Sequence, residues 1–83
     1  MKEIAYSKAA LKVLRRIGNT ESAKIRSKIA QYADDPASQA NNVKRLQGSP
    51  NFRLRVGDWR VIFNEQGQVL AILNIGPRGG IYD

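Results

Sequence analysis

The sequence predicts a single α+β domain, with two helices on one face of a mostly antiparallel four-stranded sheet. Between residues 8 and 32, apolar residues recur at three- and four-residue spacing, which is typical of amphipathic helices. From residue 52 onward, apolar and polar residues alternate around turns that contain glycine, which is typical of antiparallel strands. A chain of 83 residues can bury only one small core, so we expect one domain over residues 1–83.

The first strand and the first helix are predicted from the opening residues. Weak alternation over residues 2–6 indicates a short strand. Ser7 is expected to cap the following helix, because its hydroxyl can accept a hydrogen bond from a free N–H of the first turn. Gly18 is expected to end this helix. Its apolar stripe consists of Ala10, Leu11, Leu14 and Ile17.

A second helix is expected directly after Gly18, with Asn19 or Thr20 as its N-cap and the acid Glu21 in its first turn. Its apolar stripe consists of Ile25, Ile29 and Tyr32. Pro36 is expected to end it, because the residue before a proline is pushed out of the α region. The short break between the helices predicts an antiparallel helical hairpin. Residues 34–42 are polar and rich in turn formers, so we expect a connecting loop there.

A β-hairpin is predicted after a lead-in over residues 43–48, with a two-residue turn at Gly57–Asp58. Glycine supplies the positive φ that such turns need. This turn sets Val56 opposite Trp59 and Leu54 opposite Val61. One face of the hairpin is therefore apolar, and it is expected to face the core through Phe52, Leu54, Val56, Trp59, Val61 and Phe63.

The other face of the hairpin carries arginines. Arg53 and Arg55 share one parity, and the turn sets Arg55 directly opposite Arg60. Like charges in this arrangement are destabilising by roughly 0.2–1 kcal/mol. Because the chain also has a net charge of +7, we expect an anionic ligand at this face.

The last strand is predicted in the apolar run of residues 69–76, after a reversal over residues 64–68. A nearly continuous apolar run is typical of an interior strand. Its register stays open at this point, because a tight turn at Gln66–Gly67 and a bulged version of it send opposite parities to the core.

Composition excludes several chemistries. The chain has no cysteine, so a thiolate nucleophile, a disulfide and a cysteine-ligated zinc are excluded. It has no histidine, so any catalysis has to use arginine, lysine, tyrosine or a carboxylate. No apolar stretch approaches the roughly 18 residues of a membrane span, and the first residues lack a signal peptide's apolar core. We expect a cytoplasmic protein that needs no cofactor or metal and does not bind membranes.

The segments VKRLQGSPNFRLRVGDWRVIF and NIGPRGGIY resemble the RelE/ParE superfamily of bacterial type II toxins, the small basic partners of labile antitoxins. In that family a leucine and a glycine precede an aromatic residue, a basic-x-basic strand, a glycine turn and an aromatic–arginine pair. The family tail has a glycine, an arginine two residues later and a tyrosine four residues after that. The matching positions are Leu46, Gly48, Phe52, Arg53, Arg55, Gly57, Trp59, Arg60, Gly76, Arg78 and Tyr82.

The resemblance implies a RelE-like fold and a choice between two activities. RelE-like members are endoribonucleases that cut messenger RNA in the ribosomal A site, whereas ParE-like members poison DNA gyrase and generally lack the complete catalytic set. All five positions of that set are filled, by Arg53, Arg55, Arg60, Arg78 and Tyr82. This favours ribosome-dependent, metal-independent cleavage. The implied partners are a small acidic antitoxin and the 70S ribosome with its mRNA and rRNA. A non-catalytic nucleic-acid-binding module is a third interpretation.

Within the ribonuclease interpretation, the catalytic candidates are Arg55, Arg60, Arg78 and Tyr82, and the RNA-binding candidates are Arg53, Lys44 and Arg45. Arginine forks suit the charge that develops on a phosphoryl group. Tyr82 either acts as the base or stacks on the target nucleobase.

Two features depart from the family pattern. The best-known RelE-like enzyme has lysine at the positions of Arg53 and Arg55, and arginine cannot give up its proton as lysine can. Gly79–Gly80 follows Arg78, which predicts a mobile or unusually turned tail.

Overall fold

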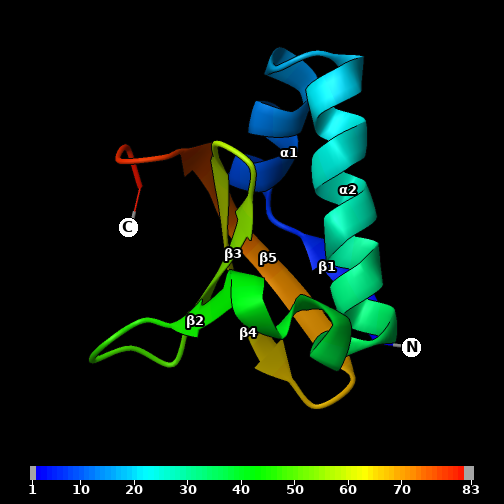
Figure 1. Cartoon of the computed structure of the whole chain (residues 1–83). Helices are drawn as coiled ribbons and strands as arrows, with labels where there is room; N and C mark the ends of the chain where they lie inside the picture. Colours follow the sequence, from blue (N-terminus) through cyan, green and yellow to red (C-terminus); the bar gives the residue numbers. More distant parts are fainter. Residues whose placement is uncertain (1, 82–83) are drawn as a thin grey trace.

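The computed structural model describes residues 2–81 and contains a five-stranded sheet covered on one face by two helices (Figure 1). The elements in chain order are β1 (Glu3–Tyr6), α1 (Lys8–Arg16), α2 (Asn19–Asp34), the 3₁₀ segment η1 (Pro36–Asn42), β2 (Val43–Arg45), β3 (Phe52–Val56), β4 (Trp59–Gln66) and β5 (Val69–Pro77). The sheet order is β1-β5-β4-β3-β2, and only the β1–β5 pair is parallel. The predicted α+β class is confirmed, with one strand more than expected.

The helix caps agree with the sequence prediction in one of two places. Ser7 caps α1, since its Oγ accepts a hydrogen bond of 3.0 Å from the N–H of Ala10. The prediction of Asn19 or Thr20 as the N-cap of α2 was wrong, because the cap is Gly18 and no side chain bonds there. Gly18 has a φ of 92°, which lets the chain reverse within one residue, so Asn19 and Thr20 already lie in the helix.

The segment between α2 and the hairpin is more regular than predicted. Pro36–Asn42 forms 3₁₀ turns rather than an open loop, and Val43–Arg45 forms the additional strand β2. This strand pairs antiparallel with β3, with Val43 opposite Leu54 and Arg45 opposite Phe52. Three residues are too few to show a recognisable alternation, so pairing with β3, rather than local sequence, defines this strand.

The β3–β4 hairpin has the predicted register. Gly57, with a φ of 58°, and Asp58 form the turn, which sets Val56 opposite Trp59 and Leu54 opposite Val61. The apolar face packs into the core, where Phe52 and Phe63 stack with ring centroids 5.5 Å apart. Trp59 is half-buried against this core, and its Nε1 donates a hydrogen bond of 2.8 Å to Glu21 Oε2 on α2.

A β-bulge explains why the register of the last strand was open. The β4–β5 turn lies at Gly67–Gln68, so the turn position considered from the sequence, Gln66–Gly67, was wrong by one residue. The pairing shifts by one residue between Ile62 and Phe63, away from the turn. Core-facing side chains therefore change parity along β5, from Leu70 and Ile72 to Ile75. The Oγ of Ser7 donates a hydrogen bond of 2.7 Å to the carbonyl of the extra residue, Leu73.

The core lies between the helices and the inner face of the sheet. Its fully buried side chains come from both layers and include Ile25, Ile29, Leu54, Val61 and Phe63. No helix within residues 2–81 is long and apolar enough to cross a membrane.

Candidate anion-binding site

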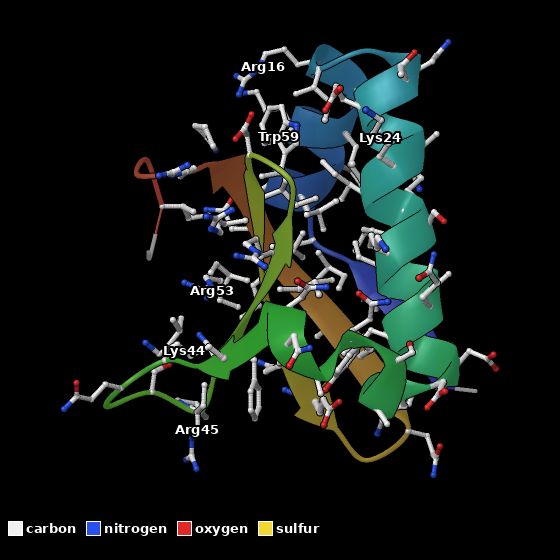
Figure 2. All side chains as sticks on the ribbon, in the orientation of Figure 1. Arg16, Lys24, Lys44, Arg45, Arg53 and Trp59 are labelled. Atoms are coloured by element: carbon white, nitrogen blue, oxygen red, sulfur yellow. The ribbon has the colours of Figure 1, made fainter. Side chains whose placement is uncertain are left out.

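Two rows of residues cross the outer face of the sheet, which is the face opposite the helices. One row runs through Lys44, Arg53, Ile62 and Asn74, and the next runs through Arg55, Arg60 and Gly76. Each row therefore places two cationic residues directly opposite each other on neighbouring strands. Arg45 has the other parity, because it pairs with Phe52, and Figure 2 shows it extending away from Lys44.

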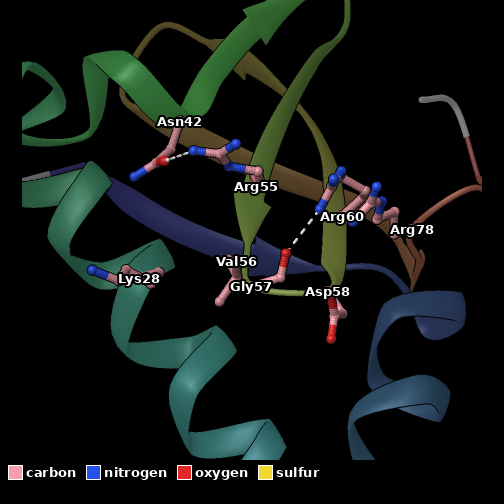
Figure 3. Close-up of a pocket in the computed structure, with 8 residues that line it drawn as sticks. All are labelled: Lys28, Asn42, Arg55, Val56, Gly57, Asp58, Arg60 and Arg78. Carbon is pink, nitrogen blue, oxygen red and sulfur yellow. Dashed lines mark hydrogen bonds between the residues drawn. The ribbon is translucent and has the colours of Figure 1, made fainter.

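An open pocket of about 700 Å³ lies where β3 extends beyond β2 (Figure 3). The pairing of β2 covers only residues 52–54 of β3, so the edge at Arg55 and Val56 is left to the pocket. Its cationic lining residues are Lys28, Arg55, Arg60 and Arg78. The rest of the lining consists of Asn42, Val56, Gly57 and Asp58. Asp58 is the only acid in this set, so the field in the pocket favours anions.

Arg60 is fixed beneath the hairpin turn. The residue is only 7% exposed, and its Nη1 donates hydrogen bonds to the carbonyls of Gly57 at 3.0 Å and Trp59 at 3.1 Å. Both acceptors belong to the hairpin itself, so the turn geometry determines where this charge lies. A charge shielded from water acts more strongly on a neighbouring ion than an exposed one.

Arg55 is exposed and is held from the opposite side. Its Nη2 donates a hydrogen bond of 3.2 Å to Oδ1 of Asn42, at the end of η1. The predicted pairing of Arg55 with Arg60 across the strands is confirmed, but the two guanidinium groups turn apart (Figure 3). This divergence lowers the repulsion between the two charges, and both arginines still line the same pocket.

Arg78 is held at the tip of the hairpin by its own backbone. Its N–H donates a hydrogen bond of 2.7 Å to the carbonyl of Asp58. The next residues form a tight turn in which the N–H of Gly80 donates to the carbonyl of Pro77 at 3.0 Å and Gly79 has a φ of 78°. Of the two alternatives that the sequence left open, a mobile tail or an unusually turned one, the structure has the turned tail.

The tail then folds back over the outer face of the sheet at Gly76. A Cβ placed on Gly76 would lie 3.2 Å from the Cβ of Ile81, closer than side chains normally approach. Gly76 occupies the same row as Arg55 and Arg60. The absence of a side chain at this position therefore allows Ile81 to lie beside the arginines.

The model for the ParE toxin of type II toxin–antitoxin systems, parDE, matches residues 4–82. The chain belongs to this toxin family. Solved structures similar to this toxin include the archaeal RelE–RelB complex from Pyrococcus horikoshii, with 24% identity, a TM-score of 0.77 and coverage of 96% of this chain and 98% of the other. The isolated Escherichia coli RelE toxin has 17% identity, a TM-score of 0.78 and coverage of 98% and 88%. A YoeB/ParE toxin from Agrobacterium tumefaciens has 14% identity, a TM-score of 0.74 and coverage of 92% and 98%. No curated protein matches the sequence.

The structure of this toxin brings together most of the predicted site residues. Arg55, Arg60 and Arg78 line one pocket, and Lys44 and Arg53 occupy the adjacent row. Arg45 is on the other side of the strand, so it does not join them. Tyr82 lies outside the described residues.

Sequence reasoning missed two residues of the pocket, Lys28 and Asn42. A signal existed for Lys28, which follows Ile25 by three residues and therefore borders the apolar stripe of α2. No comparable signal marks Asn42, because its place depends on the 3₁₀ turns of η1. Within residues 2–81, no three or more Asp or Glu side chains gather closely enough to hold a metal ion.

Proposed function

We propose that this toxin is a ribosome-dependent endoribonuclease that cleaves messenger RNA by attack of a 2′-hydroxyl on the adjacent phosphate. The observation that best supports this function is the pocket that Arg55, Arg60 and Arg78 all line. A phosphate that enters it is approached by guanidinium groups from β3, from β4 and from the tail. Arginine is suited to this task, because it donates parallel hydrogen bonds to phosphate and keeps its charge.

The proposed reaction needs no group outside the RNA as nucleophile. The 2′-oxygen forms a bond to phosphorus and loses its proton, while the bond from phosphorus to the 5′-oxygen breaks and that oxygen takes up a proton. The products are a 2′,3′-cyclic phosphate and a 5′-hydroxyl. Arg60 and Arg78 stabilise the additional negative charge on the phosphoryl oxygens, and the fixed position of Arg60 reduces the reorganisation this requires.

The remaining residues have supporting roles in this proposal. Arg53 and Lys44, one row away from the pocket, hold the flanking RNA backbone. Arg45 is retained only as a peripheral contact, because it lies on the other side of β2. Tyr82 is assigned either proton transfer or stacking on the target base, and the ribosome supplies the remaining contacts to mRNA and rRNA.

A small acidic antitoxin is the proposed protein partner. Two similar structures, from Pyrococcus horikoshii and Escherichia coli, contain a RelE toxin together with RelB. The net charge of +7 supports the same interpretation, since an acidic partner is attracted from solution at low salt. The product of the neighbouring reading frame should form a complex with the purified toxin in low salt, measured by size-exclusion chromatography. Absence of a complex there would contradict this part of the proposal.

The second candidate function is poisoning of DNA gyrase without RNA cleavage. It is favoured by the match of residues 4–82 to the model of ParE toxins. The two functions predict different damage after brief expression in cells. Cleavage should produce new mRNA ends within translated reading frames, mapped by sequencing of 5′-hydroxyl ends, and an Arg78→Ala control should lack them. DNA breaks and inhibited supercoiling with no new mRNA ends would instead support the gyrase function.

A further inference from the structure

A chain of side-chain hydrogen bonds runs from helix α2 to the pocket. Gln31 Nε2 donates to Ser27 Oγ at 3.3 Å, and Gln39 Nε2 donates to Gln31 Oε1 at 2.9 Å. Asn42 Nδ2 donates to Gln39 Oε1 at 3.1 Å, and Arg55 Nη2 donates to Asn42 Oδ1 at 3.2 Å. We call this chain the amide relay.

The amide relay has one direction, and Arg55 sets it. A guanidinium group can only donate, so Asn42 has to present its oxygen to Arg55. The amide nitrogen of Asn42 then faces Gln39, which has to accept with its oxygen. The nitrogen of Gln39 in turn faces Gln31, which also has to accept with its oxygen. Reversal of any one amide would place two donors or two acceptors against each other. Hydrogen bonds aligned in this way strengthen one another.

Gln39, in the middle of the amide relay, is buried, and a buried polar side chain has to be hydrogen-bonded. Gln39 is 4% exposed and is one of the two buried polar or charged residues within residues 2–81, the other being Arg60. Both ends of its amide group are bonded, to Gln31 and to Asn42. An apolar residue would fill the position without needing partners, so the structure uses this buried amide for orientation rather than for packing.

We propose that Gln39 and Asn42 are positioning residues that hold Arg55 in place for an anion, and this inference rests on the proposed function of the pocket. Arg55 is exposed and stands opposite the like-charged Arg60, so by itself its guanidinium group would move freely. The relay ties it to the far side of the pocket, away from Arg60. An anion then binds without the entropic cost of ordering this long side chain.

The test is a double-mutant cycle on the free toxin with inorganic phosphate as the probe. Phosphate affinity is followed by NMR at the amides of Gly57 and Arg78, and thermal unfolding verifies that each variant is folded. Gln39→Leu should weaken phosphate binding about 2- to 10-fold, the cost of ordering one long side chain. Gln39→Leu should have no further effect when combined with Arg55→Ala, and its full effect when combined with Arg53→Ala.

A second variant keeps the test decisive if Gln39→Leu fails to fold. Asn42→Ala removes the half-buried side chain that bonds directly to Arg55. It should cause the same loss of phosphate affinity, with the same dependence on Arg55. If Gln39→Leu or Asn42→Ala lowered phosphate affinity equally in the Arg55→Ala and Arg53→Ala backgrounds, the relay would be overturned, because the effect would not depend on Arg55. The relay would also be overturned if Arg55→Ala lowered phosphate affinity but Gln39→Leu and Asn42→Ala did not. Dependence on Arg55 without any mRNA cleavage would support the relay while overturning the proposed ribonuclease.

Discussion

Arg55 and Arg60 lie directly opposite each other on β3 and β4, yet each guanidinium group is bound to a different part of the chain. Arg55 donates to Asn42 beyond the edge of the sheet, whereas Arg60 donates to the carbonyls of its own hairpin turn. The backbone register brings the charges together, and the side-chain contacts separate them. An anion that binds between them removes the remaining repulsion, so it should stabilise the fold.

Phosphate should therefore raise the thermal stability of this toxin more than chloride does at the same ionic strength. At a phosphate concentration one hundred times the dissociation constant, the expected gain is about 2.7 kcal/mol. Arg55→Ala should reduce this gain. Arg45→Ala removes the same charge from the other face and is the matched control, which should leave the gain unchanged. Differential scanning calorimetry measures the effect, and an equal gain in phosphate and chloride would contradict the prediction.

Substitution of Arg60 or Arg78 by alanine should slow the cleavage step. Loss of one fixed donor to a developing charge typically lowers the rate by ~10²–10³. Arg53→Ala should mainly weaken ribosome binding and reduce its dependence on salt, because Arg53 lies in the neighbouring row rather than in the pocket. Single-turnover cleavage of ribosome-bound mRNA separates the two effects. Variants that all cleave at the parent rate once bound would exclude the proposed active site.

Tyr82→Phe should separate the two roles proposed for this tyrosine. Phenylalanine keeps the aromatic ring for stacking but cannot exchange a proton. A large loss of the single-turnover rate with unchanged binding is expected for proton transfer. Unchanged cleavage in Tyr82→Phe, together with weaker binding in Tyr82→Ala, would assign the residue to stacking.

Gly76→Val should lower the cleavage activity while changing the free energy of unfolding only slightly. The new side chain would occupy the space of Ile81 and displace the tail from the outer face of the sheet. The β-propensity of valine offsets part of the lost packing, so the free energy of unfolding should change by less than about 1 kcal/mol. Combining the substitution with Ile81→Gly should relieve the clash and recover stability. Urea denaturation and cleavage assays on the same samples provide the comparison.

The stability of the toxin should fall at alkaline pH, partly through Tyr32. Burial and the hydrogen bond of 2.7 Å that its hydroxyl donates to Glu65 raise the pKa of Tyr32 well above its usual 10.0. Above pH 10 the unfolded chain releases this proton while the folded chain keeps it, so stability decreases as pH rises and is complete below pH 10. Tyr32→Phe should flatten this decline. A smaller decline should remain, because burial also raises the pKa of Tyr6. Urea denaturation from pH 8 to 11 tests both statements.

Local chemistry explains which parts of the fold could be predicted from the sequence. Gly57–Asp58 determines its own turn, and the turn fixes the facing positions of Arg55 and Arg60, so this part was predicted residue by residue. The shift in β5 depends on Ser7, which lies more than sixty residues earlier and bonds to the carbonyl of Leu73. Strand β2 depends in the same way on a partner, because it is too short to show a pattern alone. Asn42 was missed for a different reason, because the 3₁₀ turns of η1 that place it leave no recognisable pattern in the sequence.

The pairing of β1 with β5 also affects when the toxin can become active. Residues 3–6 pair with residues 69–72, so this part of the sheet closes only after residue 72 has been synthesised. Such distant pairing is slow to form and cannot begin on a partial chain. A nascent chain that has passed α2 still lacks the strands carrying Arg55 and Arg60 and the tail carrying Arg78. The pocket therefore assembles only after Arg78 has been synthesised, later than both helices, so a partner that binds the helices can reach its surface before the pocket exists.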